Sequence, residues 1–375
     1  MKFWGFTGTN GKTTCTWIFA EFINACPGRA CGYLTTVEAF DGKDRFSTGY
    51  TTPPRAQQKE IFARMEANGL TDCVMEVSSH AIHQNRTGDT VFSGGAFTNL
   101  SEDHLDYHKT MEAYFRVKRS FAEKIAAAVT PQPNNGRKDF PPYAVCLDGG
   151  YGHEMLDAVG SLPLDVLPVT LAHPRFDLSG LRLAGDYNKS NVLLAAALAE
   201  AAGVPHETIQ SVIPTLKPRW GRLERVDNPS VPAIVYVDFA HTPDGLEKML
   251  AAVRKAHVGS ALWVVFGAGG DRDPLKRPLM GAACAKLADR LVVTSDNPRS
   301  EEPEAIIAQI SAGIAAPADR VVIEPDRAKA IDVALRSAKA GDVVVIAGKG
   351  HETTQEIKGV KHPFDDREVV RTWRP

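Results

Sequence analysis

The chain has 375 residues, of which 43% are hydrophobic and 23% charged, and its formal net charge at pH 7 is −2. This length suits two or three ordinary domains. The near-zero charge argues against bulk binding of nucleic acid or of a membrane surface, and no run of ~18 apolar residues predicts a membrane span. The six cysteines form no CxxC pair and indicate free thiols, so we expect a cytoplasmic protein. We also expect a monomer.

Short apolar runs alternate with helical stretches along the chain, which predicts parallel sheets covered by helices. In the first half, KFWGFTG reads as a strand that leads into a glycine loop and a helix over 12–25. Further strands are expected at 72–79, 95–100 and 144–148, and further helices at 111–125 and 191–203. Residues 130–142, rich in proline, asparagine and glycine, predict a surface loop.

The sequence changes character around Pro218–Asn228, where we expect a linker. A second alternation follows, with strands expected at 233–239, 261–267, 290–295, 320–324 and 342–348. Helices should begin near Pro243, Pro278, Pro303 and Asp326, because the first turn of a helix tolerates proline. This half is typical of a doubly wound domain, whose ligand site lies at the carboxyl ends of the strands.

The strongest local signal is the loop between the first strand and its helix, Gly8-Thr9-Asn10-Gly11-Lys12-Thr13-Thr14. A glycine loop at a helix N-terminus lets backbone N–H groups surround a phosphate. Lys12 would then meet the β- and γ-phosphates of a nucleotide, and the Thr13 hydroxyl would bind Mg²⁺. Phe6 stands where the general pattern has its first glycine, so this is a shortened variant. The alternative interpretation is a glycine turn with an exposed lysine.

We therefore predict an α/β protein of two domains. Residues 1–221 form a P-loop-type ATPase domain with a mainly parallel sheet, and residues 222–375 form a Rossmann-like, doubly wound C-terminal domain.

Two polar clusters in the first half are open to more than one interpretation. Glu76 ends a buried strand, where a carboxylate serves as a metal ligand, as a base, or as part of a satisfied polar cluster. His104 and His108 have the i, i+4 spacing of zinc ligands on a helix. No third soft ligand follows at a usable spacing, so a surface cluster is the alternative.

Three motifs of the second half each follow a predicted strand, at 267–273, 296–299 and 348–352. Each motif alone is compatible with a charged surface loop. Together they lie where a doubly wound sheet places its ligand. Arg272 and Arg299 offer planar guanidinium groups that pair bidentately with carboxylates, which indicates an acidic small molecule.

Taken together, these motifs resemble the Mur ligase family. The segments that carry the resemblance follow the family order along nearly the whole chain: GTNGKTT, YTTP, EVSSHAIHQNR, FTNLSEDHLDYH, MEAYFRVK, GRLERVD, VDFAHTPDGLEK, FGAGGDRD, KRPLMG, TSDNPRSEEP, AGKGHE and FDDRE. The resemblance implies an ATP-dependent amide ligase of peptidoglycan precursor synthesis. Such an enzyme phosphorylates a carboxylate to an acyl phosphate, which an amine then attacks.

The resemblance also implies roles for individual residues in the nucleotide and metal sites. Contacts to ATP are implied for Gly8, Thr9, Asn10, Gly11, Lys12, Thr13, Thr14, Asn188, Asn191, Arg222 and Asp238. Catalytic roles are implied for Lys12, Glu76, His104 and Lys118. Two Mg²⁺ ions would be held by Thr13, Glu76, His104 and Lys118, with CO₂ converting the lysine into a carbamate.

The substrates follow from the same resemblance. A muramoyl dipeptide acceptor would contact Thr51, Thr52, Ser78, Gln84 and Arg86. The incoming amino acid would contact Arg272, Asp296, Asn297, Arg299, Gly348 and Glu352. The sequence DNPR is the form found in members that add diaminopimelate, whereas members that add lysine lack the arginine. An arginine pairs with the distal carboxylate of diaminopimelate, so we favour meso-diaminopimelate over L-lysine.

Departures from the family pattern leave alternatives open. The first strand begins at Lys2, so we expect the amino-terminal domain that grips uridine diphosphate (UDP) in full-length relatives to be absent. Three alternatives follow: the chain is a fragment of a longer protein, it uses a separate UDP-binding partner, or it acts on an acceptor without UDP. A Mur-like ligase for another acid and amine is a second hypothesis, and a non-catalytic nucleotide-binding subunit is a third.

Overall fold

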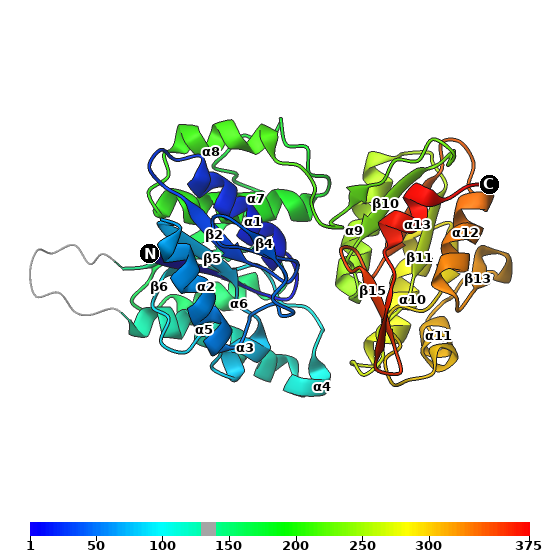
Figure 1. Ribbon diagram of the computed structural model, residues 1–375, viewed down its shortest axis with the longest axis horizontal. Helices are drawn as coiled ribbons and strands as arrows, with labels where there is room; N and C mark the ends of the chain where they lie inside the picture. The colour runs from blue at the N-terminus through cyan, green and yellow to red at the C-terminus, as the bar shows by residue number, and fades with distance from the viewer. Residues whose placement is uncertain (129–139) are drawn as a thin grey trace, which may run out of the picture. The chain divides into compact units, whose positions relative to one another are not determined.

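The computed structural model describes residues 1–128 and 140–375, drawn as a ribbon in Figure 1. Most of the predicted loop at 130–142 lies outside these residues. The chain divides into two compact units. Unit 1 comprises Met1–Ser101 and His108–Leu216, and unit 2 comprises Glu102–Tyr107 and Lys217–Pro375. Within the described residues, no helix is both long enough and apolar enough to cross a membrane.

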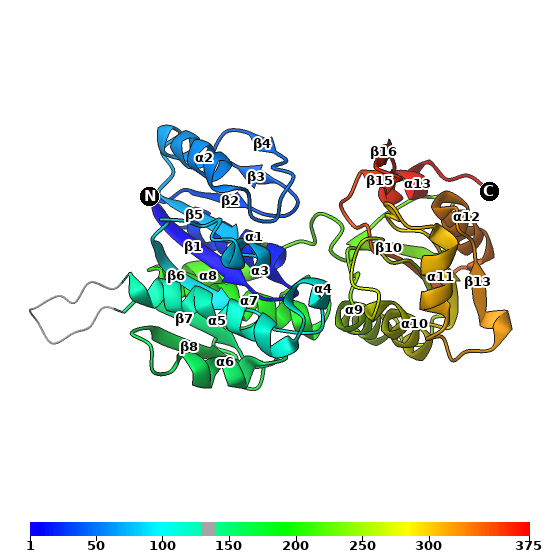
Figure 2. The ribbon, with the colours of Figure 1, turned by 90° about the horizontal axis from the view of Figure 1, so that it is seen from below.

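Unit 1 is built on one sheet whose described strands number eight, in the order β4-β3-β2-β5-β1-β6-β7-β8. Figure 2 shows the parallel part of the sheet running from β2 to β8. The strands are β1 Lys2–Thr7, β2 Cys31–Leu34, β3 Ala39–Phe40, β4 Arg45–Phe46, β5 Asp72–Glu76, β6 Phe92–Phe97, β7 Pro142–Cys146 and β8 Asp165–Val169. The central β1 pairs with β5 on one side and β6 on the other, so these three strands end at the same edge.

Helices cover both faces of this sheet, as its apolar central strands require. Helix α1 packs against α7 on one face, and residues of α2, α5 and α6 join the apolar core of the other. The helices of this part of the chain are α1 Lys12–Asn24, α2 Arg55–Ala67, α3 Ser79–His83, α4 Leu105–His108, α5 Met111–Ala127, α6 Gly152–Val159, α7 Asp186–Ala201 and α8 His206–Val212.

The predicted elements of unit 1 are present, with shifted ends. The strand expected at 72–79 stops at Glu76, because Ser78 caps α3 by accepting a hydrogen bond from the N–H of Ala81. The strand expected at 95–100 occupies Phe92–Phe97, because Thr98 leaves the sheet to bond the glycine loop. The helix expected at 191–203 begins earlier, at Asp186.

Unit 2 contains a sheet whose described strands number six, in the order β13-β12-β11-β14-β10-β9. All neighbours are parallel except β9 and β10. The strands are β9 Glu224–Arg225, β10 Ile234–Asp238, β11 Leu262–Phe266, β12 Arg290–Val293, β13 Val321–Ile323 and β14 Val343–Ala347. Because β11 lies between β12 and β14, the loops that follow these three strands are neighbours.

The helices of unit 2 lie on both faces of the sheet, which confirms the doubly wound arrangement. Helices α9, α10 and α11 pack on one face and α12 and α13 on the other. They comprise α9 Pro243–Ala256, α10 Lys276–Leu287, α11 Pro303–Ser311, α12 Arg327–Ser337 and α13 Asp366–Thr372. A hairpin of β15 Thr354–Ile357 and β16 Val360–Pro363, which was not predicted, completes the unit.

The segment predicted as a linker, Pro218–Asn228, is only partly irregular. Glu224 and Arg225 form β9, which pairs antiparallel with β10. The side-chain amide of Asn228 donates to the carbonyls of Val370 and Trp373, at 2.6 and 3.0 Å. The second part of the segment is therefore an edge of unit 2.

Unit 2 also contains an ion pair whose two side chains are fully buried. Arg327, the first residue of α12, donates to both carboxylate oxygens of Asp366 at 2.8 Å. The same guanidinium donates to the carbonyls of Ser295 and Ala347, at 3.2 and 3.0 Å. Because Ser295 follows β12 and Ala347 ends β14, one side chain fixes the spacing of two strand ends.

Replacing this arginine should cost far more stability than replacing an exposed one. Arg327→Met leaves the Asp366 carboxylate buried without its cation, so we expect the free energy of unfolding to fall by about 3–5 kcal/mol. The control is Arg225→Met, whose pair with Asp227 is mostly exposed to solvent and screened, so its loss should stay within about 1 kcal/mol. Urea denaturation followed by circular dichroism measures both, and equal losses would contradict the assignment.

Candidate active site

The loop from Gly8 to Gly11 turns β1 into α1 with two residues in left-handed conformations. Gly8 has φ 147° and Gly11 has φ 86°. A Cβ on Gly8 would collide with Thr98, and one on Gly11 would approach the amide of Asn191 to 2.5 Å. The N-cap residue of α1 is Gly11, which has no side chain that could accept a hydrogen bond from the first N–H groups of the helix. Such a helix start suits a phosphate or another anion.

Residues directly after β6 hold the loop in place. The N–H of Thr9 donates to the carbonyl of Asn99 at 2.9 Å, and the N–H of Asn10 donates to Asn99 Oδ1 at 3.0 Å. Thr98 Oγ1 donates to the carbonyl of Asn10 at 2.6 Å. No local motif marks Asn99, because its bonds to the loop depend on the pairing of β1 with β6, which are distant along the chain.

Two lysines converge on the same loop carbonyl. Lys12 Nζ donates to the carbonyls of Gly8 and Thr9, at 3.0 and 2.8 Å. Lys118, which lies on α5 and is 1% exposed, donates to the carbonyl of Gly8 at 2.6 Å. Its ammonium also lies 5.2 Å from the centre of the Tyr114 ring. Two positive charges beside the N-terminus of α1 make this loop attractive to anions.

Glu76 lies at the end of β5, buried and surrounded by hydroxyl groups. Thr13 Oγ1 and the N–H of Thr36 both donate to Glu76 Oε1 at 2.7 Å. Thr36 Oγ1 donates to Glu76 Oε2 at 3.2 Å. Adjacent carboxylate and hydroxyl oxygens are the ligand type that Mg²⁺ prefers. The structure thus brings Thr13 and Glu76 together, and adds Thr36, which no local motif had indicated.

The residues predicted to bind the acceptor substrate form one hydrogen-bonded network around Glu76, through its backbone carbonyl and, by way of Thr36, its carboxylate. Thr52 Oγ1 donates to the carbonyl of Glu76 at 2.8 Å and accepts from the N–H of Ser78 at 3.0 Å. Arg86 donates to the carbonyl of Thr52 and to the side-chain oxygen of Gln84, at 3.2 and 2.9 Å. The Thr51 and Thr36 hydroxyls are 3.0 Å apart. The network links all five predicted residues to Glu76.

Asn191, one of the two predicted asparagines of α7, lies against the glycine-loop helix. Asn191 accepts from the Cys15 thiol at 3.4 Å and faces Gly11. Asn188, three residues earlier, donates to the carbonyl of Ala184 at 2.7 Å. Both side chains are largely buried in unit 1.

His104 and His108 do not share a helix face, because α4 begins only at Leu105. His104 has φ 57° and belongs to the segment grouped with unit 2, where its Nε2 lies 3.5 Å from Asp103. His108 belongs to unit 1, where it stacks on Tyr114 and shares a 2.9 Å hydrogen bond with Ser79. Across residues 1–128 and 140–375, no group of three or more His, Cys, Asp or Glu side chains is placed to hold a metal.

In unit 2 the two strand-end arginines lie side by side over Gly269. A Cβ on this glycine would be 2.9 Å from Arg299 Nη1 and 3.7 Å from Arg272 Cγ. Arg299 adopts φ 52° and donates to the carbonyl of Gly270 at 2.5 Å. Burial and the charge of Arg299 together lower the pKa of Arg272. Two arginines beside the same glycine favour the binding of an anion there.

The loops after β12 and β14 meet beside these arginines. Asn297 Nδ2 donates to Glu352 Oε2 at 2.8 Å. Asp296 Oδ1 accepts from the N–H of Asn297 at 2.7 Å, while its buried Oδ2 has no hydrogen-bond partner among the described residues. Gly348 has φ 116°, and the Asp296 carboxylate occupies the space of its missing Cβ. The six residues predicted for the amino acid therefore occupy three neighbouring loops.

Arg222 and Asp238 lie elsewhere in unit 2, near the end of β10. The carboxylate of Asp238 accepts from the N–H groups of Leu223 and Ala240, at 2.6 and 2.7 Å, and burial raises its pKa. The Arg222 guanidinium lies 4.5 Å from the centre of the Phe239 ring. Both predicted residues thus flank the same strand end.

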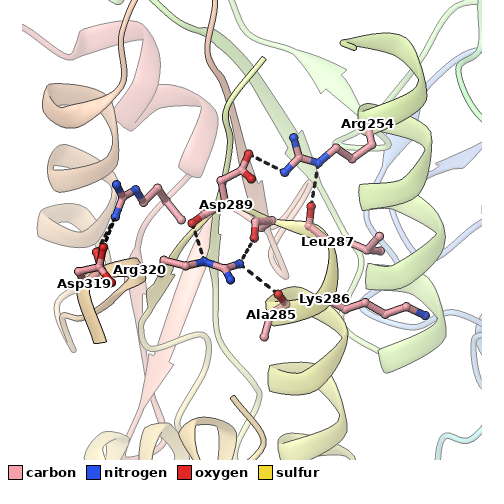
Figure 3. Close-up of a pocket in the computed structure, with 9 residues that line it drawn as sticks. Arg254, Ala285, Lys286, Leu287, Asp289, Asp319 and Arg320 are labelled. Atoms are coloured by element: carbon pink, nitrogen blue, oxygen red, sulfur yellow. Dashed lines mark hydrogen bonds and ion pairs between the residues drawn. The ribbon is translucent and has the colours of Figure 1, made fainter. Parts of the chain in front are cut away.

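A polar pocket of about 690 Å³ in unit 2 contains none of the predicted residues (Figure 3). It lies at the start of β12, the opposite end from the three loops. Arg254 donates to the carbonyl of Leu287 at 2.9 Å, and Arg320 donates to those of Asp289 and Ala288, at 3.0 and 2.6 Å. Its arginines therefore serve to cap backbone carbonyls.

Family profiles, known sequences and a solved structure all match the chain, and they point to one protein family. Two family profiles match, the "Mur ligase middle domain" over residues 6–140 and the "Mur ligase, glutamate ligase domain" over residues 221–350. UDP-N-acetylmuramoyl-L-alanyl-D-glutamate--2,6-diaminopimelate ligases of Neisseria meningitidis and Synechococcus elongatus are each 40% identical. The matches cover 99% of this chain, and 77% and 76% of those proteins. A solved structure of a ligase with the same name aligns with TM-score 0.60 and 32% identity, over 99% of this chain and 77% of the other.

His351, next to Glu352, should make stability depend on pH. Burial and the charges of Arg222 and Arg367 lower the pKa of His351 to about 3. The unfolded chain restores a pKa of roughly 6.5, so between these values the unfolded state binds more protons. The free energy of unfolding should therefore be highest above pH 6.5 and fall as the pH drops towards 3.

Urea denaturation at pH 7 and at pH 5 measures this dependence. His351→Asn should lose part of the decrease, because the buried imidazole is gone. His362→Asn, at an exposed position of β16, should keep the full decrease. An unchanged slope in His351→Asn would show that His351 is not protonated on unfolding.

Proposed function

Because the chain belongs to the Mur ligase family, we propose that it is the ATP-dependent ligase that joins meso-2,6-diaminopimelate to the D-glutamyl carboxylate of UDP-N-acetylmuramoyl-L-alanyl-D-glutamate. The observation that carries the proposal is that Arg272 and Arg299 both lie against Gly269, in loops next to the one that holds Asn297 and Glu352 together. This arrangement offers cations to a carboxylate and an acceptor to an ammonium group, as the distal end of diaminopimelate requires.

The nucleotide would bind at the loop of unit 1. The N–H groups of Gly11, Lys12 and Thr13 are suited to the β- and γ-phosphates, and the positive charge of Lys12 would offset the negative charge of these phosphates. The full proposed set comprises Gly8, Thr9, Asn10, Gly11, Lys12, Thr13, Thr14, Asn188 and Asn191 from unit 1, with Arg222 and Asp238 from unit 2.

Members of this family use ATP with Mg²⁺, and the oxygens present fit that ion. Thr13 Oγ1 and the Glu76 carboxylate, 2.7 Å apart, are hard oxygen ligands. Bound there, Mg²⁺ supplies positive charge that offsets the charge on the transferred phosphoryl group. Thr13 would hold a first ion, and Glu76 with His104 and carbamylated Lys118 a second. A carbamate keeps one N–H, so Lys118 could retain its bond to the Gly8 carbonyl.

The reaction then proceeds in two balanced steps. The acceptor carboxylate attacks the γ-phosphorus of ATP, which breaks the bond to ADP and forms an acyl phosphate. The uncharged amine attacks the acyl carbon, and the tetrahedral intermediate expels inorganic phosphate as the amide forms and the nitrogen loses a proton. Lys12 would stay beside the phosphoryl group throughout, where it offsets negative charge.

The acceptor would be held by the network around Glu76. Thr51, Thr52 and Ser78 offer hydroxyl groups, and Gln84 with Arg86 offers an amide and a guanidinium group. These groups suit a peptide with free carboxylates.

The open alternatives are an acceptor without UDP, a separate UDP-binding partner and L-lysine as the amine. We propose that the protein works in the cytoplasm as a monomer.

Phosphate release from Mg-ATP tests the proposal, with acceptor or amine omitted in turn. A ligase should release phosphate only when the muramoyl dipeptide and diaminopimelate are both present, and a ligated product should appear by mass spectrometry. Release without either substrate would indicate a plain ATPase, and no release would indicate a binding subunit. Equal KM values for acceptors with and without UDP would favour the alternative acceptor.

Arg299→Ala should weaken the amino acid selectively. Loss of one charge-assisted pair to the distal carboxylate is expected to raise the KM for diaminopimelate roughly ten- to hundredfold. The KM for ATP should stay within about twofold, because the Arg299 side chain bonds Gly270 and Glu356 of unit 2, away from the glycine loop of unit 1. Steady-state kinetics measure both constants. An unchanged KM for diaminopimelate would disprove the pocket assignment, and Arg225→Met serves as the control for loss of an arginine charge.

A further inference from the structure

Lys349 is a fully buried lysine whose ammonium reaches two residues of the proposed amino-acid pocket. Its relative exposure is 0%. Its Nζ donates to Asn297 Oδ1 at 3.1 Å and to Glu352 Oε2 at 2.9 Å. A lysine is rarely buried unless it is paired, and these are its acceptors in the described chain. Lys349 lies within the segment AGKGHE, and no sequence pattern assigns it a role.

These bonds fix which way the Asn297 amide faces. Oδ1 accepts from Lys349 Nζ and also from the N–H of Glu356, at 2.9 Å. Both groups can only donate, so the oxygen must face them and Nδ2 must face Glu352. The backbone is held as well, since the Asn297 carbonyl accepts from the N–H of Gly270 at 2.9 Å. Asn297 therefore has a single orientation, and it is set by Lys349 and Glu356.

The same lysine orients the Glu352 carboxylate. Oε2 accepts from both Lys349 Nζ and Asn297 Nδ2, while Oε1 has no hydrogen-bond partner among the described residues. The side chain is 32% exposed, so Oε1 remains able to meet a ligand. What the pair offers is thus one carboxylate oxygen that accepts and one amide hydrogen that donates. An ammonium group and a carboxylate on one carbon atom match that pattern.

We propose that Lys349 is a positioning residue that sets the hydrogen-bonding pattern Asn297 and Glu352 present to the amino acid substrate. The inference rests on the proposed function and adds to it a residue that does not touch the substrate. Because Lys349 is inaccessible, it acts through its two neighbours. Without its ammonium, the Asn297 amide loses one of the two donors that hold its oxygen. Glu352 loses the cation that holds Oε2, and so its single orientation.

The test is Lys349→Met, which keeps the length of the side chain and removes its donors. The KM for diaminopimelate should rise about ten- to hundredfold, while the KM values for ATP and the acceptor stay within about twofold. The matched control is Lys286→Met, an exposed lysine of α10 paired with Glu247, which should change none of the three. A merely structural lysine would lower thermal stability and affect all three constants alike.

A double-mutant cycle tests whether Lys349 acts through Asn297. In the Asn297→Ala background, Lys349→Met should raise the KM for diaminopimelate by a smaller factor than in the wild-type background, since the part of its effect that runs through Asn297 is already lost. Fully multiplicative effects would overturn the proposal. If Lys349→Met alone does not fold, Lys349→Met with Glu352→Gln removes both charges of this ion pair. Relative to Glu352→Gln alone, this double variant should still raise that KM through Asn297, and no rise would overturn the proposal.

The outcome separates this inference from the proposed function. Wild-type protein is assayed first for phosphate release that depends on diaminopimelate. Failure there rejects the proposed function itself. Wild-type activity combined with an unchanged KM for diaminopimelate in folded Lys349→Met rejects only the role of Lys349.

Discussion

A positive charge taken out of water must meet an acceptor, and this constraint shapes the strand-end loops of both units. An unpaired buried charge costs several kcal/mol, enough to remove much of the stability of a domain. In unit 1 the buried Lys118 bonds the Gly8 carbonyl. In unit 2 the buried cations Arg277, Arg327 and Lys349 bond the loops after β11, β12 and β14. Each of these loops therefore supplies an acceptor to a buried cation, and the bond holds the loop in place.

The parallel sheets explain why so few cations suffice. Neighbouring parallel strands end at one edge, so a side chain that reaches this edge contacts two or three loops at once. Arg327 does so from the start of α12, where it meets the residues that follow β12 and end β14. Arg277, on α10, donates to the Gly269 carbonyl and pairs with Glu301. A site built this way is preorganised, because its loops are held by groups that never meet the ligand.

Sequence alone predicts those parts of the molecule whose signal is local. The central strands of both parallel sheets are continuous apolar runs, and the glycine loop carries its own pattern, so these could be located without a structure. The parallel strands β2 and β8 of unit 1 were not predicted. The short strand β9 and the hairpin β15–β16 are polar and lie at edges, so no periodicity marks them. Thr36, Asn99 and Lys349 depend on contacts between segments far apart in the chain, or read as ordinary surface residues. The spacing of His104 and His108 suggested one helix face, but the helix begins between them.

The pocket of unit 2 carries both signs of charge, and this bears on which amine it would select. Arg272 and Arg299 repel each other over Gly269, which is one cause of the lowered pKa of Arg272. A distal carboxylate would relieve that repulsion and accept hydrogen bonds from both groups, whereas lysine has no carboxylate at that end. A site built to bond a polar group rejects an analogue without it far more strongly than an apolar pocket rejects a missing methylene, because its own polar groups stay unpaired. Discrimination against lysine would thus arise from the arginine pair. Asn297 and Glu352, oriented by Lys349, would bind the remaining polar atoms of the amino acid.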